Sequence, residues 1–176
     1  MINKLISLLP PPSPRALDDA IWLTFESEKN LRLPNDFKEL ISNYGCGAID
    51  DFLWLLNPLS KNSNLNFEKS KYFLEAYAVM RQDFLSDYPR PDYPEKGSFL
   101  PWAVTDNGET IVWLVDGEAD SWRVAIHSSD QGEEEVYDFG CVEFLSKLLT
   151  KDISSNILPV QFSSAALEKH FFTPID

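Results

Sequence analysis

The sequence predicts an α+β fold, a single domain in which an antiparallel or mixed β-sheet packs against helices. Between residues 99 and 139, short runs of β-branched and aromatic residues are separated by Asn107-Gly108 and Asp116-Gly117, dipeptides that favour the tight turns of a meander. The preceding half of the chain shows apolar residues at helical spacing, and one more such stretch follows the meander. Strands that follow helices and are closed by a helix are typical of the α+β class.

The composition indicates a folded domain with a large core. The chain has 176 residues, of which 44% are hydrophobic, with five Trp and twelve Phe, and this composition argues against global disorder. No apolar run approaches the roughly 20 residues that span a bilayer, and prolines 10–12 stand where a signal-peptide cleavage site would lie. Cys46 and Cys141 form no CxxC pair, so we expect two buried thiols and a cytoplasmic protein.

The N-terminal part of the chain is predicted to contain an arm and two helices. We expect residues 1–13 to form a proline-rich arm and residues 14–28 to form a helix, because apolar side chains recur there every four residues. Pro34 separates this helix from a second one, which ends at Gly45, since glycine readily adopts a left-handed C-cap. The apolar positions that define the two helices are Leu17, Ile21 and Phe25, then Phe37, Leu40, Ile41 and Tyr44.

The middle of the chain is predicted to hold a strand, a loop and a long helix. Residues 49–56 are apolar and aromatic, as in a buried strand, and residues 60–66 are a polar loop. Residues 67–85 form the helix. The prolines of residues 88–94 predict an extended, exposed segment, since proline fits neither a helix interior nor a central strand. The expected apolar face of the helix consists of Phe73, Tyr77, Met80 and Phe84.

The meander is predicted to be apolar on both sides. Side chains alternate between the two faces of a strand. The sheet is therefore either covered by helices on both faces or left with one exposed apolar groove. In its second strand, one face receives Ile111, Trp113 and Val115, and the other receives Thr110, Val112, Leu114 and Asp116.

A closing helix and a tail complete the expected domain. Apolar residues at 142, 145 and 149 indicate a helix that ends near Thr150. We therefore expect the domain to occupy residues 14–150 and residues 151–176 to be a C-terminal extension packed on it. A short helix near residues 164–171 is expected within this extension.

The charge of the chain is strongly acidic and unevenly distributed. The net charge is −13, and residues 99–176 carry 14 Asp and Glu against 4 Lys and Arg. A strongly acidic surface repels nucleic acid and anionic membranes, and it accelerates the association with a basic protein. The meander half is therefore expected to attract a basic partner. Solubility alone is the alternative explanation of the charge.

The sequence shows no catalytic or metal-binding constellation. Nucleophilic catalysis would need a base, and the only histidines, His127 and His170, are expected to be solvated or hydrogen-bonded. The consecutive acids of residues 133–135 alternate faces in a strand and do not converge on a metal. The acids of residues 116–120 faintly suggest a calcium loop, but they lack its full pattern. We expect no enzyme, no metal and no cofactor.

Several short motifs follow one another in a particular order and spacing along the chain. They are the helix entry Leu33–Phe37, the stop Tyr44–Gly47 with residues 49–58 after it, the hairpin Pro101–Glu109 with Val112-Trp113, and the closing segment Val136–Leu149. In this order and spacing they resemble the SUKH superfamily, whose best-known branch is SMI1/KNR4. The resemblance covers roughly residues 14–150. Cys46 replaces the middle glycine of the family's usual helix stop, and Glu109 replaces its usual aspartate.

The resemblance implies a non-catalytic α+β domain. Bacterial members are typically immunity proteins that bind and block a cognate toxin domain, often a nuclease or a deaminase. The family offers no shared catalytic residues, and its toxin contacts vary between members. A scaffold or regulatory binding module, as in the eukaryotic branch, is the alternative, with residues 88–94 as its ligand site. The oligomeric state, monomer or weak dimer, stays open.

The residues that contact a partner must therefore be inferred from physical chemistry. A nuclease is basic where it holds phosphate, so its inhibitor is expected to present acids and aromatic anchors. Packing of the tryptophans in the core is the alternative. The candidate partner-binding residues are Asp106, Glu109, Asp116, Glu118, Asp120, Glu133, Glu134 and Glu135, with Trp102 and Trp122 as anchors.

Overall fold

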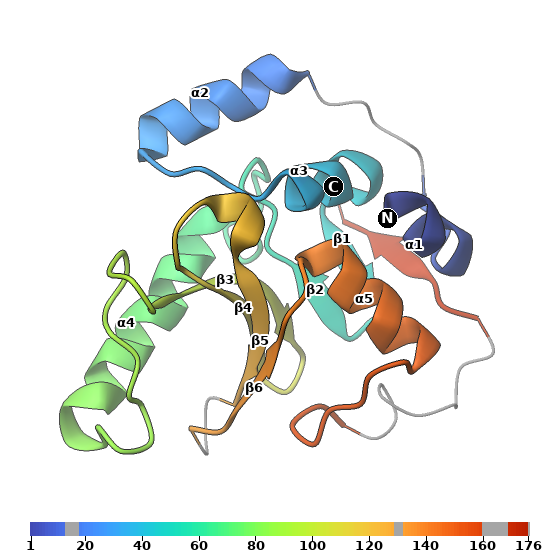
Figure 1. Ribbon diagram of the computed structural model, residues 1–176. Helices are drawn as coiled ribbons and strands as arrows, with labels where there is room; N and C mark the ends of the chain where they lie inside the picture. The colour runs from blue at the N-terminus through green and yellow to red at the C-terminus, as the bar shows by residue number, and fades with distance from the viewer. Residues whose placement is uncertain (13–17, 129–131, 160–168, 176) are drawn as a thin grey trace.

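A seven-stranded antiparallel sheet forms the frame of the protein in the computed structural model, which describes residues 1–12, 18–128, 132–159 and 169–175 (Figure 1). The strand order is β6-β5-β4-β3-β2-β1-β7. Strands β3 to β6 are consecutive in the chain, and the predicted meander is thus confirmed. The strands are β1 (Gly47–Ile49), β2 (Leu53–Leu55), β3 (Phe99–Thr105), β4 (Thr110–Leu114), β5 (Arg123–His127), β6 (Glu134–Tyr137) and β7 (Phe172–Pro174).

Helices cover both faces of this sheet (Figure 1). Helix α4 lies on one face, and α1, α3 and α5 lie on the other. The arrangement decides between the two alternatives for the meander, because no apolar groove is left along its described strands. The described helices are α1 (Ile2–Leu8), α2 (Asp19–Lys29), α3 (Asn35–Tyr44), α4 (Phe67–Asp83) and α5 (Cys141–Thr150), with a short 3₁₀ turn η1 (Ala119–Ser121). Among the described residues, no helix has the length and apolarity that a membrane span requires.

Aromatic side chains fill the centre of the larger core. Phe37 of α3 stands edge-on to Trp113 of β4, with ring centroids 4.8 Å apart, and Trp113 stacks on Trp102 of β3 at 5.9 Å. The indole N–H groups of both tryptophans are buried without a partner among the described residues, which costs about 1–3 kcal/mol each. Burying roughly 150–250 Å² of each ring contributes about 4–6 kcal/mol, so the burial prevails.

The helices lie close to the positions predicted from periodicity. Helix α3 buries all four of its predicted apolar residues and ends at Gly45, as expected. The φ of Gly45 is 74°, which glycine adopts readily, but its ψ of −134° lies outside the left-handed helical region expected for this cap. Helix α2 starts later than expected, because the carboxylate of Asp18 accepts a hydrogen bond from the Ala20 N–H (3.0 Å) and caps it. Residues 13–17, where its start was expected, lie outside the described residues. In α4, Tyr77 is buried, but Phe84 is half exposed at its end, against expectation.

The strand expected over residues 49–56 is instead a hairpin of β1 and β2. Asp50 and Asp51 have φ angles of 53° and 52°, and the Phe52 N–H donates to the Ile49 carbonyl (3.1 Å). Two left-handed residues in succession make the kind of turn that joins antiparallel strands. Aspartate can adopt this conformation, but an Asp-Asp pair is a weaker turn signal in a sequence than Asn-Gly. The turn was therefore not recognised within the apolar run.

The C-terminal strand β7 completes the sheet beside β1, which the sequence did not predict. The Asp50 carboxylate accepts a hydrogen bond from the Phe171 N–H (3.0 Å) and lies 2.7 Å from Nδ1 of His170. The His170 ring also meets the Leu149 carbonyl through Nε2 (3.0 Å). The hairpin turn thus anchors the tail. Most of the helix expected over residues 164–171 lies outside the described residues.

The prediction of a proline-rich arm over residues 1–13 is wrong for its first part. Residues 2–8 form α1, and Leu5 and Leu9 are fully buried against the main core. The Tyr44 hydroxyl donates a hydrogen bond to the Leu9 carbonyl (2.6 Å), which fixes the end of α1. A two-turn helix is unstable in isolation. Packing against α5 therefore stabilises α1, and the local sequence pattern alone did not predict this helix.

Substitution of Leu5 by alanine is expected to lower the free energy of unfolding by about 2–5 kcal/mol, because a fully buried leucine leaves a cavity. Urea denaturation followed by circular dichroism measures it. The matched control is Asn3→Ala on the exposed side of α1, which should stay within about 0.5 kcal/mol of wild type. Equal, near-zero effects of both would mean that α1 does not pack on the domain in solution.

Candidate functional site

The acids predicted to bind a partner lie at two opposite ends of the meander. Asp106 and Glu109 belong to the turn between β3 and β4. In β6, Glu134 pairs with His127 at the end of β5, which places the acids of residues 133–135 near that same end. Asp116, Glu118 and Asp120 join β4 to β5 at the other end. The expected acids therefore do not form one continuous face.

Most of these acids stabilise the fold of the chain itself. The Asp120 carboxylate caps α3 by accepting from the Asn35 backbone N–H (2.6 Å), and its second oxygen accepts from the Asn35 amide (2.7 Å). Glu118 and Glu133 alone are exposed and have side chains without an ion pair or hydrogen bond to the described residues. The other partners are Trp54 Nε1 for Asp106 (2.6 Å), the Thr105 hydroxyl for Glu109, Lys96 for Asp116 (2.9 Å), Arg90 for Glu134, and Asn156 for Glu135 (2.7 Å).

The two tryptophans proposed as anchors are core residues. Trp102 is 1% exposed, and Trp122 is 8% exposed. Trp122 donates its Nε1–H to the Gly117 carbonyl (3.2 Å) and packs on Trp113, with ring centroids 6.1 Å apart. The prediction that they meet a partner at the surface is wrong, and the core alternative holds, because each ring is needed to fill the space between the sheet and its helices.

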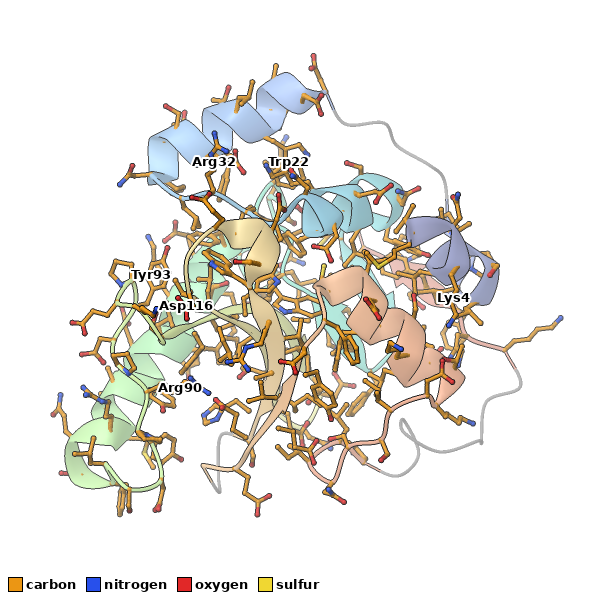
Figure 2. The ribbon with its side chains drawn as sticks, in the orientation of Figure 1. Lys4, Trp22, Arg32, Arg90, Tyr93 and Asp116 are labelled. Atoms are coloured by element: carbon orange, nitrogen blue, oxygen red, sulfur yellow. The ribbon has the colours of Figure 1, made fainter. Side chains whose placement is uncertain are left out.

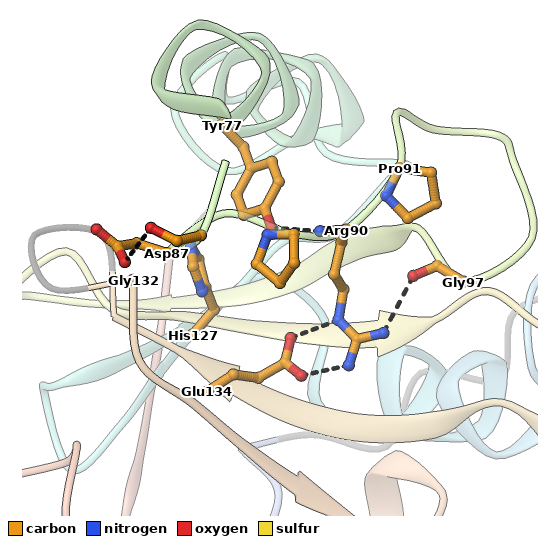
Figure 3. Close-up of a pocket in the computed structure, with 10 residues that line it drawn as sticks. Tyr77, Asp87, Arg90, Pro91, Gly97, His127, Gly132 and Glu134 are labelled. Atoms are coloured by element: carbon orange, nitrogen blue, oxygen red, sulfur yellow. Dashed lines mark hydrogen bonds and ion pairs between the residues drawn. The ribbon is translucent and has the colours of Figure 1, made fainter. Parts of the chain in front are cut away.

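A pocket of about 540 Å³ opens where the connection between α4 and β3 passes the end of β5 (Figure 3). Ser86, Asp87, residues 89–91 and Gly97 of this connection form one wall, and the other lining residues are Tyr77 of α4, His127, Gly132 and Glu134. The wall approaches Gly132 so closely that a Cβ there would lie 2.6 Å from the Asp87 carbonyl oxygen. This glycine allows the two segments to meet. Figure 2 shows Arg90 and Tyr93 on the α4 side of the sheet.

Arg90 and Glu134 form the central ion pair of the pocket (Figure 3). The Arg90 Nε–H donates to one carboxylate oxygen of Glu134 (2.6 Å), and a terminal nitrogen donates to the other. The remaining terminal nitrogen donates to the Gly97 carbonyl (3.1 Å). Both side chains are about three-quarters buried. This two-point pairing fixes the connection to β6, since an Arg–carboxylate fork has a defined geometry.

His127 lies beneath this pair and is 6% exposed. Its ring centroid lies 5.2 Å from that of Tyr77, 5.6 Å from Phe99 and 5.9 Å from Tyr88. Burial lowers the pKa of His127 below its ordinary value near 6.5, and the positive charge of Arg90 acts in the same direction. The Glu134 carboxylate and the Glu133 backbone act against this shift. The ring is therefore neutral at physiological pH.

The pocket's polar groups are largely bound to one another. The Tyr77 hydroxyl accepts a hydrogen bond from the Arg90 backbone N–H (3.0 Å), and the Arg90 side chain is bound by Glu134 and Gly97. Among the described residues, no group of His, Cys, Asp and Glu has the arrangement of a metal site. What the pocket offers a ligand is shape, aromatic surface and the exposed carboxylate of Asp87.

Sequence reasoning missed the pocket because it expected residues 88–94 to be exposed. Tyr88 is 3% exposed, and Arg90 is held by the ion pair, so this expectation is wrong for both. Neighbouring prolines at 89 and 91 restrict the backbone around Arg90. An arginine between two prolines is a sequence signal for a fixed ion pair, because its backbone is restricted. Its partner Glu134, however, lies 44 residues away and could not be identified from a local sequence pattern.

A comparison with protein families gives one match. The family described as SMI1-KNR4 cell-wall, SUKH_6, matches residues 22–145, well over half of the chain. The chain belongs to the SMI1-KNR4 family. Comparison with curated proteins and with solved structures gave no match. The resemblance inferred from sequence motifs is thus confirmed, and the matched residues include the pocket. Helix α1 and strand β7 lie outside the match, although both pack on the same core. The expected domain boundaries at residues 14 and 150 stay a prediction.

The Glu134→Gln variant is expected to unfold more easily than wild type, by about 1.5–3 kcal/mol, because the Arg90 charge loses its carboxylate in a largely buried position. Chemical denaturation measures the difference. Glu133→Gln is the matched control, since the carboxylate of Glu133 is exposed and makes no ion pair with the described residues. A comparable loss in both variants would show that the ion pair does not hold the connection.

Acid is expected to destabilise the protein through His127. The unfolded ring takes up a proton near pH 6.5, and the folded ring does so only at a lower pH. The stabilisation from a neutral His127 is therefore complete above pH 6.5 and is lost as the pH falls through the folded pKa. Unfolding free energies from pH 7.5 to 5 should fall more steeply for wild type than for His127→Phe. Parallel curves for the two proteins would contradict this role of His127.

Proposed function

We propose that this SMI1-KNR4 family protein is an immunity protein, which binds a cognate toxin domain and blocks it without catalysing a reaction. The observation that carries the proposal is the family match over residues 22–145. An immunity protein needs a rigid surface, and the packing of helices on both faces of the sheet provides one. Family membership is consistent with this role, and the binding and blocking of a toxin domain is what we propose.

The charge of the chain supports a basic partner. The net charge is −13, and the exposed side chains of Glu118 and Glu133 have no partner among the described residues. Opposite charges on two proteins raise the rate of association, and this effect decreases as salt screens the charges. A nuclease domain, which holds phosphate with Lys and Arg, is one toxin class that fits this charge.

The pocket supports a binding role rather than a catalytic one. Its arginine is held by a carboxylate, its tyrosine hydroxyl accepts a backbone hydrogen bond, and its histidine is buried beneath aromatic rings. The SMI1-KNR4 family is generally non-catalytic. The alternative of a scaffold that uses residues 88–94 as its exposed ligand site is weakened, because Tyr88 and Arg90 are engaged within the domain.

Co-expression of the full chain is expected to restore the growth of cells that produce a toxin domain from the same source genome. The purified pair should associate at least about tenfold more slowly at 500 mM than at 50 mM salt, because screening removes the electrostatic attraction. Stopped-flow fluorescence measures the rate. The proposal is refuted if the toxin domains of the source genome neither bind the chain nor are inhibited by it.

A further inference from the structure

We infer that the pocket beside the Arg90–Glu134 pair receives an arginine side chain of the toxin domain. The inference rests on the proposed function and deepens it, because it names the chemical group by which the partner is held. The pocket has a volume of about 540 Å³, which accommodates one guanidinium group and its aliphatic stem. The exposed carboxylate of Asp87 and the aromatic surface around His127 select this group.

The lining of the pocket carries an unbalanced negative charge. Its charged side chains are Asp87, Glu134 and Arg90, while burial keeps the His127 ring neutral. Arg90 and Glu134 neutralise each other through two parallel hydrogen bonds. Asp87 makes no ion pair with the described residues, and its side chain accepts a hydrogen bond from the Ser86 hydroxyl (2.9 Å). The charge of Asp87 is therefore available to a cation.

The segments around the pocket have no base to spare. Residues 81–97, at the end of α4 and in the connection to β3, carry four acids and three bases, and residues 133–134 add two acids. Each of the three bases is paired with an acid, so the remaining acids set the local charge. The pairs are Arg81–Asp92, Arg90–Glu134 and Lys96–Asp116, and the exposed acids without an ion pair to the described residues are Asp83, Asp87, Glu95 and Glu133.

The His127 ring brings a hydrogen-bond acceptor to the pocket. It lines the pocket although it is only 6% exposed (Figure 3). The backbone of Glu133 accepts from one ring nitrogen. A neutral imidazole has one donor nitrogen and one acceptor nitrogen, so the second nitrogen is left as an acceptor. An N–H group of a ligand satisfies it, whereas a carboxylate does not.

The apolar surface of the pocket suits arginine better than lysine. Tyr77 and His127 offer aromatic rings whose centroids lie 5.2 Å apart, and Pro89 and Pro91 line the same pocket. A guanidinium group is planar, stacks on aromatic rings and presents five N–H donors, whereas an ammonium group is a compact point charge. The methylene stem of an arginine packs on apolar surface such as the proline rings.

The same charges argue against other occupants. An anion would be repelled by Asp87, and the bonds of Arg90 to Glu134 and to the Gly97 carbonyl already use its positive charge. A second copy of the chain would bring a net charge of −13 toward these acids. A protein partner is the source of the arginine, because one side chain binds weakly by itself and strongly at the centre of an interface, where arginines are enriched.

Titration of the full chain with a blocked arginine tests the pocket without the toxin. The probe is N-acetyl-arginine methylamide, and the matched neutral probe is N-acetyl-citrulline methylamide, which keeps the shape and lacks the charge. The chain has two histidines, so proton NMR resolves the ring protons of His127, which the His127→Phe variant assigns. Blocked arginine should shift them saturably at pH 7.5, and citrulline should bind at least about threefold more weakly.

Two substitutions that remove the same charge locate the binding. Asp87→Asn should weaken the binding of blocked arginine at least about threefold. Glu118→Gln, at the other end of the meander, should leave it unchanged. Both side chains are exposed, so both variants should fold, and thermal melts check this. Equal binding of citrulline, undiminished binding to Asp87→Asn, equal weakening by Glu118→Gln, or a shift of His170 alone would each overturn the inference.

The same two variants separate this inference from the proposed function when they are tested with the toxin. Growth rescue by wild type, with an affinity for the toxin at least about tenfold lower in Asp87→Asn than in Glu118→Gln, supports both. Rescue by wild type with equal affinities of the two variants overturns the pocket contact and leaves the immunity role in place. If wild type rescues no toxin from the source genome, the proposed function fails, and the arginine titration then decides the pocket by itself.

Discussion

The edge-on contact between Phe37 and Trp113 is the packing interaction on which the rest of the domain depends. It joins α3 to the centre of the sheet, and Trp113 in turn supports Trp102 and Trp122. On its far side, Trp102 meets Phe144 of α5 edge-on. Aromatic pairs in such geometry stabilise beyond the area that they bury. Helices α3 and α5 are therefore both positioned by one continuous aromatic cluster.

The opposite face of the sheet is organised by polar contacts as well as by packing. Helix α4 covers it through Tyr77, and the connection that returns from α4 to β3 is fixed by the pairing of Arg90 with Glu134. Because this connection stands away from the sheet, it leaves a pocket above His127. The pocket is thus a consequence of how the chain crosses from helix to strand, and its charged groups hold that crossing in place.

The acidity of the chain has more than one physical role. Asp120 caps α3, Asp50 holds the C-terminal segment, and Glu134 neutralises a buried arginine. Each of these carboxylates stabilises the native state by accepting hydrogen bonds from charged or backbone donors. Other acids, among them Glu75 and Asp83 on α4, are exposed and make no ion pair with the described residues. Net charge alone does not separate the two groups, and the hydrogen-bond partners do.

The sequence by itself determined the α+β class, the meander, the positions of α3, α4 and α5, and the SMI1-KNR4 family, because turn dipeptides, helical spacing and short motifs are local signals. Tertiary structure decided that residues 2–8 are helical, that β7 joins β1, and that Arg90 pairs with Glu134. These features depend on contacts between residues far apart in the chain, such as Arg90 with Glu134 at 44 positions and Asp50 with His170 at 120 positions. For the same reason, Trp102 and Trp122 could be assigned to the core only when their surroundings were known, since an aromatic side chain suits a core and an interface equally well.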